Sequence, residues 1–569
     1  SWLTTTEALG APMPTWTTCM IDADSDRCRR LSLAIAVGAK DLAFVSHKKR
    51  GGQQSTSNIN MSSSAEALSS LIWAGESGFS YEFSLLSASS FLGLAFVIPS
   101  WLIRMAMKST TARKVSNNNS NSCSSQWTDK VRGIFTVLLF MLACELPVWL
   151  STPNEGLADL IQGRDPQLNE ILARVPAIRQ GPSPPLFFRN RHIQFIPFLI
   201  QNAIHQMDAI PYERVEMEVR DCVDKRFSQC HHSSQMMNDT VTLDIFPPFD
   251  TEDYDDFNRS SPVILFAPGL RCHSQDLPGN SIVRKAYGSG FRSIVVNRRG
   301  HTPDQPLKSP RWNLFGDVDD MEQVYWFIKR NFVPSHTAFF LHGISSGSAV
   351  TVTALSKWDK RRTELREKTP AFVASVAVAP GYDISKVLNR DRFLWPYNDI
   401  MMQSVKDHFV MKNEALLRSH NNDAVEMMLE ASSLQEFAEA GVTFAGYDNT
   451  TLYYQDTNPI NEVRDITTPK LVLNAVDDPC CMIDNLYEAS PYAQHEGKTF
   501  AQMIRETKRG LIAVTYTGSH CPFLCTRNRW LPFVNDPVTG GWMLNNWSDQ
   551  VAIEYYRAAL DVYGSRRFL

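Results

Sequence analysis

Downstream of residue 151, short apolar runs alternate with segments in which apolar positions recur at helical spacing. Continuous apolar runs of this kind are typical of strands that are buried on both faces. Six of them stand out, at residues 263–267, 293–297, 337–341, 372–379, 471–475 and 511–516. Helical spacing is clearest at residues 314–332 and 346–357. The alternation predicts an α/β domain over residues 152–569, built on a mostly parallel, doubly wound sheet with helices on both faces.

A long segment, residues 381–468, separates two of the predicted strands. It is rich in methionine and phenylalanine, and five of its methionines fall in helical stretches: Met401, Met402, Met411, Met427 and Met428. We interpret this segment as a helical cap inserted into the sheet domain. Ordinary helix packing explains the methionines equally well.

The first 151 residues follow a different pattern. Residues 1–80 are mixed and include a polar stretch at 51–64, so we expect a poorly ordered N-terminal region. Within residues 81–151, the segment 83–103 contains no charged side chain, and the segment 133–150 is more apolar still although it includes Glu145 and Pro147. These are one or two candidate transmembrane helices. A buried or interfacial helix is the alternative for each segment.

Basic side chains lie between the two candidate membrane segments. They are Arg104, Lys108, Arg113, Lys114, Lys130 and Arg132, with Asp129 as the only acid. The positive-inside rule places this loop on the cytoplasmic side of a membrane. The domain after residue 151 is then expected in the lumen or outside the cell, held by one or two passes, and the organelle stays open.

Composition narrows the range of partners. Across 569 residues, 56 Lys and Arg stand against 60 Asp and Glu, which leaves no basic excess for binding nucleic acid. The eleven cysteines include no CxxC pair, the signature of a zinc ribbon. The run Cys230-His231-His232 lacks a second ligand pair at suitable spacing, so we predict no metal. The sequence does not decide whether Cys222 and Cys230 form a disulfide, and it does not indicate the oligomeric state.

Candidate chemistry begins with a G-x-S-x-G sequence, Gly343-Ile344-Ser345-Ser346-Gly347. The string alone is weak, but here it directly follows a predicted strand and precedes a predicted helix, which is the context of a nucleophile elbow. The turn strains the backbone of Ser345, and the helix N-terminus favours a developing oxyanion. We predict Ser345 as the nucleophile, with an ordinary strand–helix turn as the alternative.

A serine nucleophile of this kind needs an acid and then a histidine downstream in the chain. Asp477 and Asp478 follow the fifth apolar run, at a strand end, and His520 follows the last predicted strand. His495, the other histidine beyond Asp478, lies in a polar loop. We predict His520 as the base and Asp478 as the acid that orients it, with Asp477 as a local hydrogen-bonding residue.

An oxyanion hole needs two backbone N–H donors. The residue after the nucleophile, Ser346, supplies one of them. The other comes from the loop after residues 263–267, which reads Pro268-Gly269-Leu270-Arg271, and we predict Leu270 as this donor. These groups require no metal and no organic cofactor.

With these residues identified, the chain resembles the α/β-hydrolase superfamily, in particular the YheT-like group of ABHD1/ABHD2/ABHD3-type lipases and plant EMB8-like proteins. The resemblance covers roughly residues 185–565. It rests on Arg191-His192-Ile193-Gln194, residues 216–220, Leu243-Asp244, Pro268-Gly269-Leu270, and residues 297–300, 317–320, 433–469 and 474–479. Two motifs depart from it. The elbow of relatives tends to read G-F-S-L-G-G-N where this chain has GISSGSA, and their histidine motif tends to read G-G-H-x-G-F where this chain has GSHCPF.

The resemblance implies an α/β-hydrolase fold with a helical cap and an N-terminal membrane-associated segment. It further implies a membrane-associated serine hydrolase, a carboxylesterase or lipase, that cleaves acyl esters such as acylglycerols or phospholipids through an acyl-enzyme. A flexible apolar cap suits acyl chains. Two alternatives remain: an acyltransferase that passes the acyl group to an alcohol, and a non-catalytic binding module on the same scaffold. The natural substrate and its chain length are not indicated.

Overall fold

The computed structural model describes residues 156–564, apart from residues 186–187, 221–237, 250–253, 255, 303, 366–370, 490–496 and 526–532. The predicted N-terminal region, both candidate membrane segments, Cys222, the Cys230-His231-His232 run and His495 lie outside the described residues. Among the helices that are described, none combines the length and the apolar character needed to cross a bilayer.

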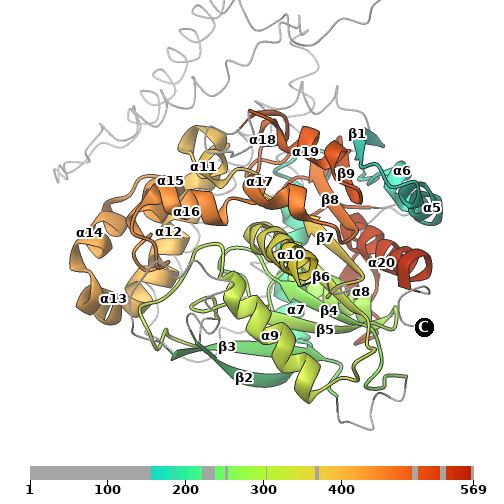
Figure 1. The fold of residues 1–569 in the computed structure, drawn as a ribbon, viewed down its shortest axis with the longest axis horizontal. Coiled ribbons are helices and arrows are strands. Elements are labelled where there is room, and N and C mark those ends of the chain that lie inside the picture. Colours follow the sequence, from blue (N-terminus) through green and yellow to red (C-terminus); the bar gives the residue numbers. More distant parts are fainter. Residues whose placement is uncertain are drawn as a thin grey trace, which may run out of the picture. The chain divides into compact units, whose positions relative to one another are not determined.

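The core of the described chain is one nine-stranded mixed sheet with the strand order β1-β9-β8-β7-β6-β4-β5-β3-β2 (Figure 1). In that order the strands are β1 (Leu157–Gln162), β9 (Gly510–Thr515), β8 (Lys470–Ala475), β7 (Ala374–Val378), β6 (Phe339–Ile344), β4 (Val263–Ala267), β5 (Arg292–Asn297), β3 (Asn238–Phe246) and β2 (Glu213–Arg220). A separate hairpin pairs β10 (Phe533–Asn535) with β11 (Trp542–Leu544).

Helices flank this sheet along the chain. They are α5 (Gln167–Arg174), α6 (Pro176–Gln180), α7 (Phe195–Met207), α8 (Gly279–Tyr287), α9 (Val318–Asn331), α10 (Ser346–Glu364), α18 (Asp484–Tyr487), α19 (Phe500–Glu506) and α20 (Trp547–Ala559). Side-chain capping interactions define where two of these helices begin. The side chain of Asn546 caps α20, and Thr499 forms a capping box at α19.

The six neighbouring strands from β9 to β5 run parallel, and their side chains are buried on both faces. Along β6, Phe340 and Ile344 enter one core cluster, whereas Phe339 and Leu341 enter another. Apolar side chains of α8 and α20 complete the first cluster, and those of α9 and α10 complete the second (Figure 1). The predicted doubly wound, mostly parallel sheet is confirmed.

The six predicted strands correspond to β4 through β9, and the two predicted helices correspond to α9 and α10. Among the strands the largest shift is at β6, which continues through His342 and Gly343 because the strand runs directly into the turn at Ser345. The apolar runs do not predict the three antiparallel strands, which are β1 and β2 at the two edges of the sheet and β3 next to β2. β2 exposes Glu216 and Glu218 while burying Met217 and Val219.

The strand order reverses at β4. From β4 the chain passes to β5 on one side, and it then returns to β6 on the other side. In parallel α/β sheets such a switch leaves a crevice at the carboxyl ends of the strands, where ligands bind. The loop after β4 and the turn that carries Ser345 both leave the sheet at this edge.

Between β7 and β8 the chain forms an insertion of helices. These are α11 (Ile384–Val387), α12 (Tyr397–Val405), α13 (Glu414–His420), α14 (Asn422–Glu430), α15 (Leu434–Ala440), α16 (Thr450–Thr457) and α17 (Pro459–Glu462). Side-chain N-caps define four of their starts: Asp383 for α11, Asn421 for α14, Ser433 for α15 and Asn449 for α16.

The insertion and the segment that follows β5 together form a separate buried core. Trp312 from that segment stacks on Phe409 with ring centroids 4.9 Å apart. Met402 and Met428 are buried in this core, whereas Met411 and Met427 are exposed. Ordinary packing therefore accounts for two of the five methionines.

Candidate active site

Ser345 lies at the sharp turn between β6 and α10. Its backbone has φ 53° and ψ −124°, a conformation that non-glycine residues rarely adopt. A β-carbon on Gly347 would lie 2.1 Å from the carbonyl oxygen of Ala267, and one on Gly343 would lie 2.7 Å from the carbonyl oxygen of Gly347. Neither position accepts a larger residue without displacing backbone, so the glycines of the G-x-S-x-G sequence permit this turn.

The structure brings Ser345, His520 and Asp478 into one hydrogen-bonded chain. The Oγ of Ser345 lies 2.9 Å from Nε2 of His520. Nδ1 of the same imidazole lies 2.9 Å and 3.1 Å from the two carboxylate oxygens of Asp478. The three side chains come from the loops after β6, β9 and β8, which all leave the sheet at its carboxyl edge.

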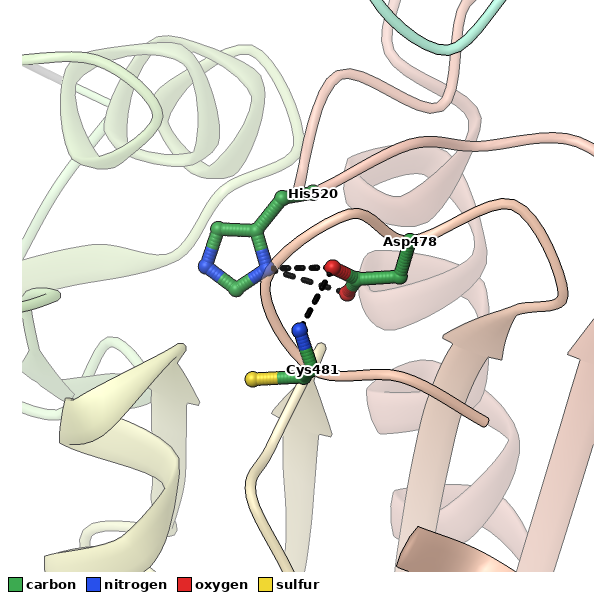
Figure 2. Close-up of side chains that lie close together, drawn as sticks. All are labelled: Asp478, Cys481 and His520. Carbon is green, nitrogen blue, oxygen red and sulfur yellow. Dashed lines mark hydrogen bonds and ion pairs between the residues drawn. The ribbon is translucent and has the colours of Figure 1, made fainter. Parts of the chain in front are cut away.

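Asp478 is fixed by the turn that follows it. Its Oδ1 accepts backbone hydrogen bonds of 2.8 Å from both Cys480 and Cys481, and its side chain is fully buried. Figure 2 shows the carboxylate between the imidazole of His520 and the backbone of Cys481. Burial is the largest single influence and lowers the pKa of His520, but the Asp478 carboxylate, together with the neighbouring cysteines, holds that pKa well above its ordinary value.

The neighbouring carboxylate, Asp477, has different partners. Its Oδ1 accepts a 2.7 Å hydrogen bond from the backbone N–H of Ser519, and its Oδ2 accepts one of 3.1 Å from the side chain of Gln194. Burial raises the pKa of Asp477 to about 7. Asp477 thus joins the histidine loop to the segment before α7, and it is Asp478 that reaches the imidazole.

The loop that carries His520 has a strained backbone on both sides of the histidine. Ser519 has φ 51° and Cys521 has φ 82°, values at which L-residues cost about 1–2 kcal/mol. Side-chain hydrogen bonds hold this loop. Ser519 Oγ donates to the carbonyl of Arg191 at 2.7 Å, and Asn546 Nδ2 donates to the carbonyl of Cys521 at 3.3 Å.

Leu270 and Ser346, the predicted oxyanion donors, both line the cavity that contains Ser345. Within the described part of the chain, neither backbone N–H donates a hydrogen bond to another protein group. Both amides are therefore free to bind an oxygen of a ligand.

Arg298 is a residue that the sequence reasoning did not single out. It is buried beneath the loop after β4, where its Nη2 donates to the carbonyls of Pro268 (2.9 Å) and Gly269 (2.7 Å) and to Oγ of Ser346 (3.2 Å). Because the C=O and N–H of a trans peptide point in opposite directions, this contact turns the N–H of Leu270 away from the guanidinium. Burial lowers the pKa of Arg298 to about 10, so it stays charged at neutral pH.

The sequence signal for Arg298 is the motif at residues 297–300, which contributed to the resemblance without a role for either of its two arginines. The second of the pair, Arg299, forms a buried ion pair with Asp320, with contacts of 2.8 Å and 2.5 Å. That ion pair joins the end of β5 to α9. Arg298 therefore contacts the loops of the site, whereas Arg299 stabilises the packing of β5 against α9.

A cavity opens at Ser345 and His520. Its polar lining comes mainly from Ser345, Ser346, His520 and the adjacent Cys480 and Cys481. The rest of its wall is apolar and is formed largely by the inserted helices and the segment after β5, including Leu314, Phe315, Leu388, Phe393, Met401 and Leu434. The apolar character of this lining suits a mostly apolar ligand.

Comparison with known proteins finds distant relatives. No protein-family model matches the sequence. The chain is similar to "Monoacylglycerol lipase ABHD2" of Danio rerio, 24% identical over 331 residues, which is 56% of this chain and 68% of that protein. It is also similar to "Phospholipase ABHD3" of Homo sapiens, 26% identical over 246 residues, which is 42% of this chain and 56% of that protein.

The chain belongs to the α/β-hydrolase superfamily. The resemblance inferred from its motifs is confirmed, and the ABHD2- and ABHD3-type proteins are distant homologues. Among solved structures, the α/β-hydrolase GrgF of Penicillium sp. sh18 matches it with a TM-score of 0.31 and 15% identity, covering 54% of this chain and 91% of that one.

Proposed function

We propose that this α/β-hydrolase is a serine esterase or lipase that cleaves carboxylic acyl esters. The observation that carries the proposal is the hydrogen-bonded chain from Ser345 through His520 to Asp478 at the base of an apolar cavity. A serine alone is a weak nucleophile, and an adjacent base that is itself oriented by a third group activates it.

In the proposed reaction, His520 takes the proton of Ser345 as Oγ attacks the ester carbonyl carbon. Asp478 holds the ring in the correct orientation and stabilises the imidazolium without taking the proton itself. The imidazolium then gives its proton to the departing alcohol, and the acyl group stays on Ser345. Water repeats the sequence, with His520 as base, and releases the acid.

The backbone N–H groups of Leu270 and Ser346 are the proposed donors to the oxyanion of each tetrahedral intermediate. Arg298 is a positioning residue for them, because it holds the Gly269 carbonyl and thereby sets the direction of the Leu270 N–H. Fixed donors of this kind act without reorganising during the reaction.

The proposed substrates are acyl esters of lipids. The apolar wall of the cavity can accept an acyl chain, while its polar groups gather at Ser345. Two relatives bear the names monoacylglycerol lipase and phospholipase, which supports the same class of substrate. The inserted helices form the outer wall of this cavity and are the proposed cap.

A fluorophosphonate probe tests the proposal, because it labels an activated serine covalently. We expect labelling of the full chain, its loss in Ser345→Ala, and its retention in Ser346→Ala, where only the backbone N–H of residue 346 takes part. Equal labelling of the wild type and Ser345→Ala would contradict the proposal and favour a non-catalytic module. Added alcohol that captures the acyl group faster than water would identify an acyltransferase.

Membrane association is a second part of the proposal, and it rests on the apolar segments 83–103 and 133–150. An arginine in the middle of a spanning helix costs about 2.5–3.5 kcal/mol. We therefore expect Leu94→Arg combined with Leu142→Arg to release the full chain from membranes in an alkaline extraction that leaves the wild type bound. A double variant that stays bound would contradict these spans.

The proposed side of the membrane has its own test. Asn258-Arg259-Ser260 is an acceptor sequence for N-glycosylation, and Asn258 is exposed. A lumenal or extracellular domain should carry glycans that an endoglycosidase removes, and Asn258→Gln should remove one of them, because Asn238 and Asn449 also begin exposed acceptor sequences. A chain without any glycan would place the domain on the other side.

A further inference from the structure

Three groups of the kind that bind metals lie close together at the imidazole that contacts Ser345. Figure 2 shows these three side chains. They are the thiol of Cys481, the imidazole of His520 and the carboxylate of Asp478. One possible ligand atom from each lies within 4.8 Å of the other two. Cys481 is a free, buried cysteine. The proposed ester cleavage uses the carboxylate and the imidazole but has no part for this thiol.

We propose that this cluster binds one Zn²⁺ ion, or a similar thiophilic divalent cation, and that the bound ion inhibits the hydrolase reversibly. Zinc takes sulfur, nitrogen and oxygen ligands tetrahedrally at about 2.0–2.3 Å, so its ligand atoms lie roughly 3.3–3.8 Å apart. The three side chains reach these separations with small shifts. The cavity lined by Cys481 and His520 supplies an entry path and room for a water as the fourth ligand.

Binding changes the chemistry of His520. The thiol and the imidazole release protons to solvent as they bind the ion, since metal ligands must be deprotonated. The imidazole then serves as a metal ligand, and the positive ion opposes protonation of the ring. It no longer accepts the proton of Ser345. Inhibition therefore rests on the proposed function, whereas binding of the ion does not.

Cys480 offers a matched control. Like Cys481, it donates its backbone N–H to Asp478 at 2.8 Å and lines the cavity. Within the described residues, only the thiol of Cys481 belongs to the three-ligand cluster. Replacing each cysteine in turn with serine keeps both backbone contacts and removes one thiol.

A titration of the full chain with Cd²⁺ tests binding, because cadmium–thiolate complexes have a charge-transfer band in the ultraviolet. We expect one tight site in the wild type and in Cys480→Ser. The affinity should fall at least about 100-fold in Cys481→Ser and in His520→Ala, since even an outer-shell partner is worth 10–100-fold. Equal affinity of the two cysteine variants, or tight binding that persists in His520→Ala, would overturn the proposal.

A second assay measures inhibition through fluorophosphonate labelling of Ser345. Zn²⁺ should block labelling of the wild type and Cys480→Ser, a chelator should restore it, and Cys481→Ser should need about 100-fold more zinc. Equal block of both variants would overturn the inhibitory site. If Ser345 is not labelled even without zinc, the proposed function fails, and the cadmium titration still decides the metal site.

Discussion

The turn at Ser345 and the loop at His520 both hold strained backbone, but different contacts maintain them. The Ser345 turn is held by main chain: its N–H donates to the carbonyl of Val378 at 2.8 Å, and its carbonyl accepts from Ser348 at 2.9 Å. The His520 loop is held largely by side chains, among them Asp477 and the hydroxyl of Ser519. Substitutions of the turn glycines should therefore damage the fold, whereas those around the histidine should alter the reaction or cost little.

The largest expected effect is on the reaction. Asp478→Asn keeps the shape of the side chain but removes the charge that holds the pKa of His520 above its ordinary value. We expect kcat to fall about 10⁴-fold. His520 must be neutral to accept a proton, so activity is lost as pH falls through its pKa. In the wild type the midpoint of this acidic limb of the pH–activity curve should lie above pH 6.5. In the variant the midpoint should move to lower pH.

The pH dependence of kcat/KM measures this limb. An unchanged rate, or a limb that does not move in Asp478→Asn, would show that this carboxylate does not act on His520. Asp477→Asn is the control, because Asp477 contacts Ser519 and Gln194 rather than the imidazole.

The next effect is on stability, at the serine turn. In Gly347→Ala the new methyl would lie 2.1 Å from the carbonyl oxygen of Ala267, so β4 and α10 must separate. We expect the free energy of unfolding to fall by more than about 3 kcal/mol, the range of severe overpacking. Chemical denaturation measures it. Gly290→Ala is the control: nothing lies within 4 Å of the new methyl, and only its φ of +82° costs about 1–2 kcal/mol. Similar losses in both variants would contradict the close approach at Gly347.

A smaller effect is expected from Arg298→Met, which removes the donor beneath the loop after β4. Losing an oxyanion donor outright costs 10²–10³-fold in kcat, so a donor that is only misdirected should cost about 10–100-fold. KM should change little, because the donors act on the transition state. Arg298→Lys should recover part of kcat. A loss of stability without any change in kcat would show that Arg298 only supports the fold.

The smallest effect sharpens the comparison at the histidine loop. Ser519→Ala removes the hydrogen bond to the Arg191 carbonyl and should lower the free energy of unfolding by about 1 kcal/mol. Ser519→Gly removes the same bond but relieves the strain at φ 51°, worth about 1–2 kcal/mol, and should be at least as stable as the wild type. If the glycine variant unfolds more easily than the alanine variant, the loop is not strained.

The parallel centre of the sheet could be predicted because each of its strands is apolar on both faces. Val263–Ala267, for example, contains five consecutive apolar residues, and all five are buried. The edge strands could not be predicted in this way. β2 has one face in solvent, and the glutamates on that face break the apolar run. Edge strands leave an alternating pattern, which is weaker in a segment of eight residues.

The predicted site residues were found because chain order and strand ends limit the choices. The structure places Ser345, His520 and Asp478 within hydrogen-bonding distance, and it places Leu270 and Ser346 at the same cavity. Arg298 and the thiol of Cys481 could not be found. Their importance depends on contacts with loops far away in the chain, and a local pattern does not say which carbonyl a buried guanidinium meets.

The order of the strands has a consequence for the newly made chain. Ser345 is synthesised 175 residues before His520, and the two meet only when β9 has paired with β8. Until that last parallel strand docks, the serine has no base and stays chemically inert. A nascent or partly folded chain therefore has no activated serine, and the proposed hydrolytic competence begins only when the sheet is complete.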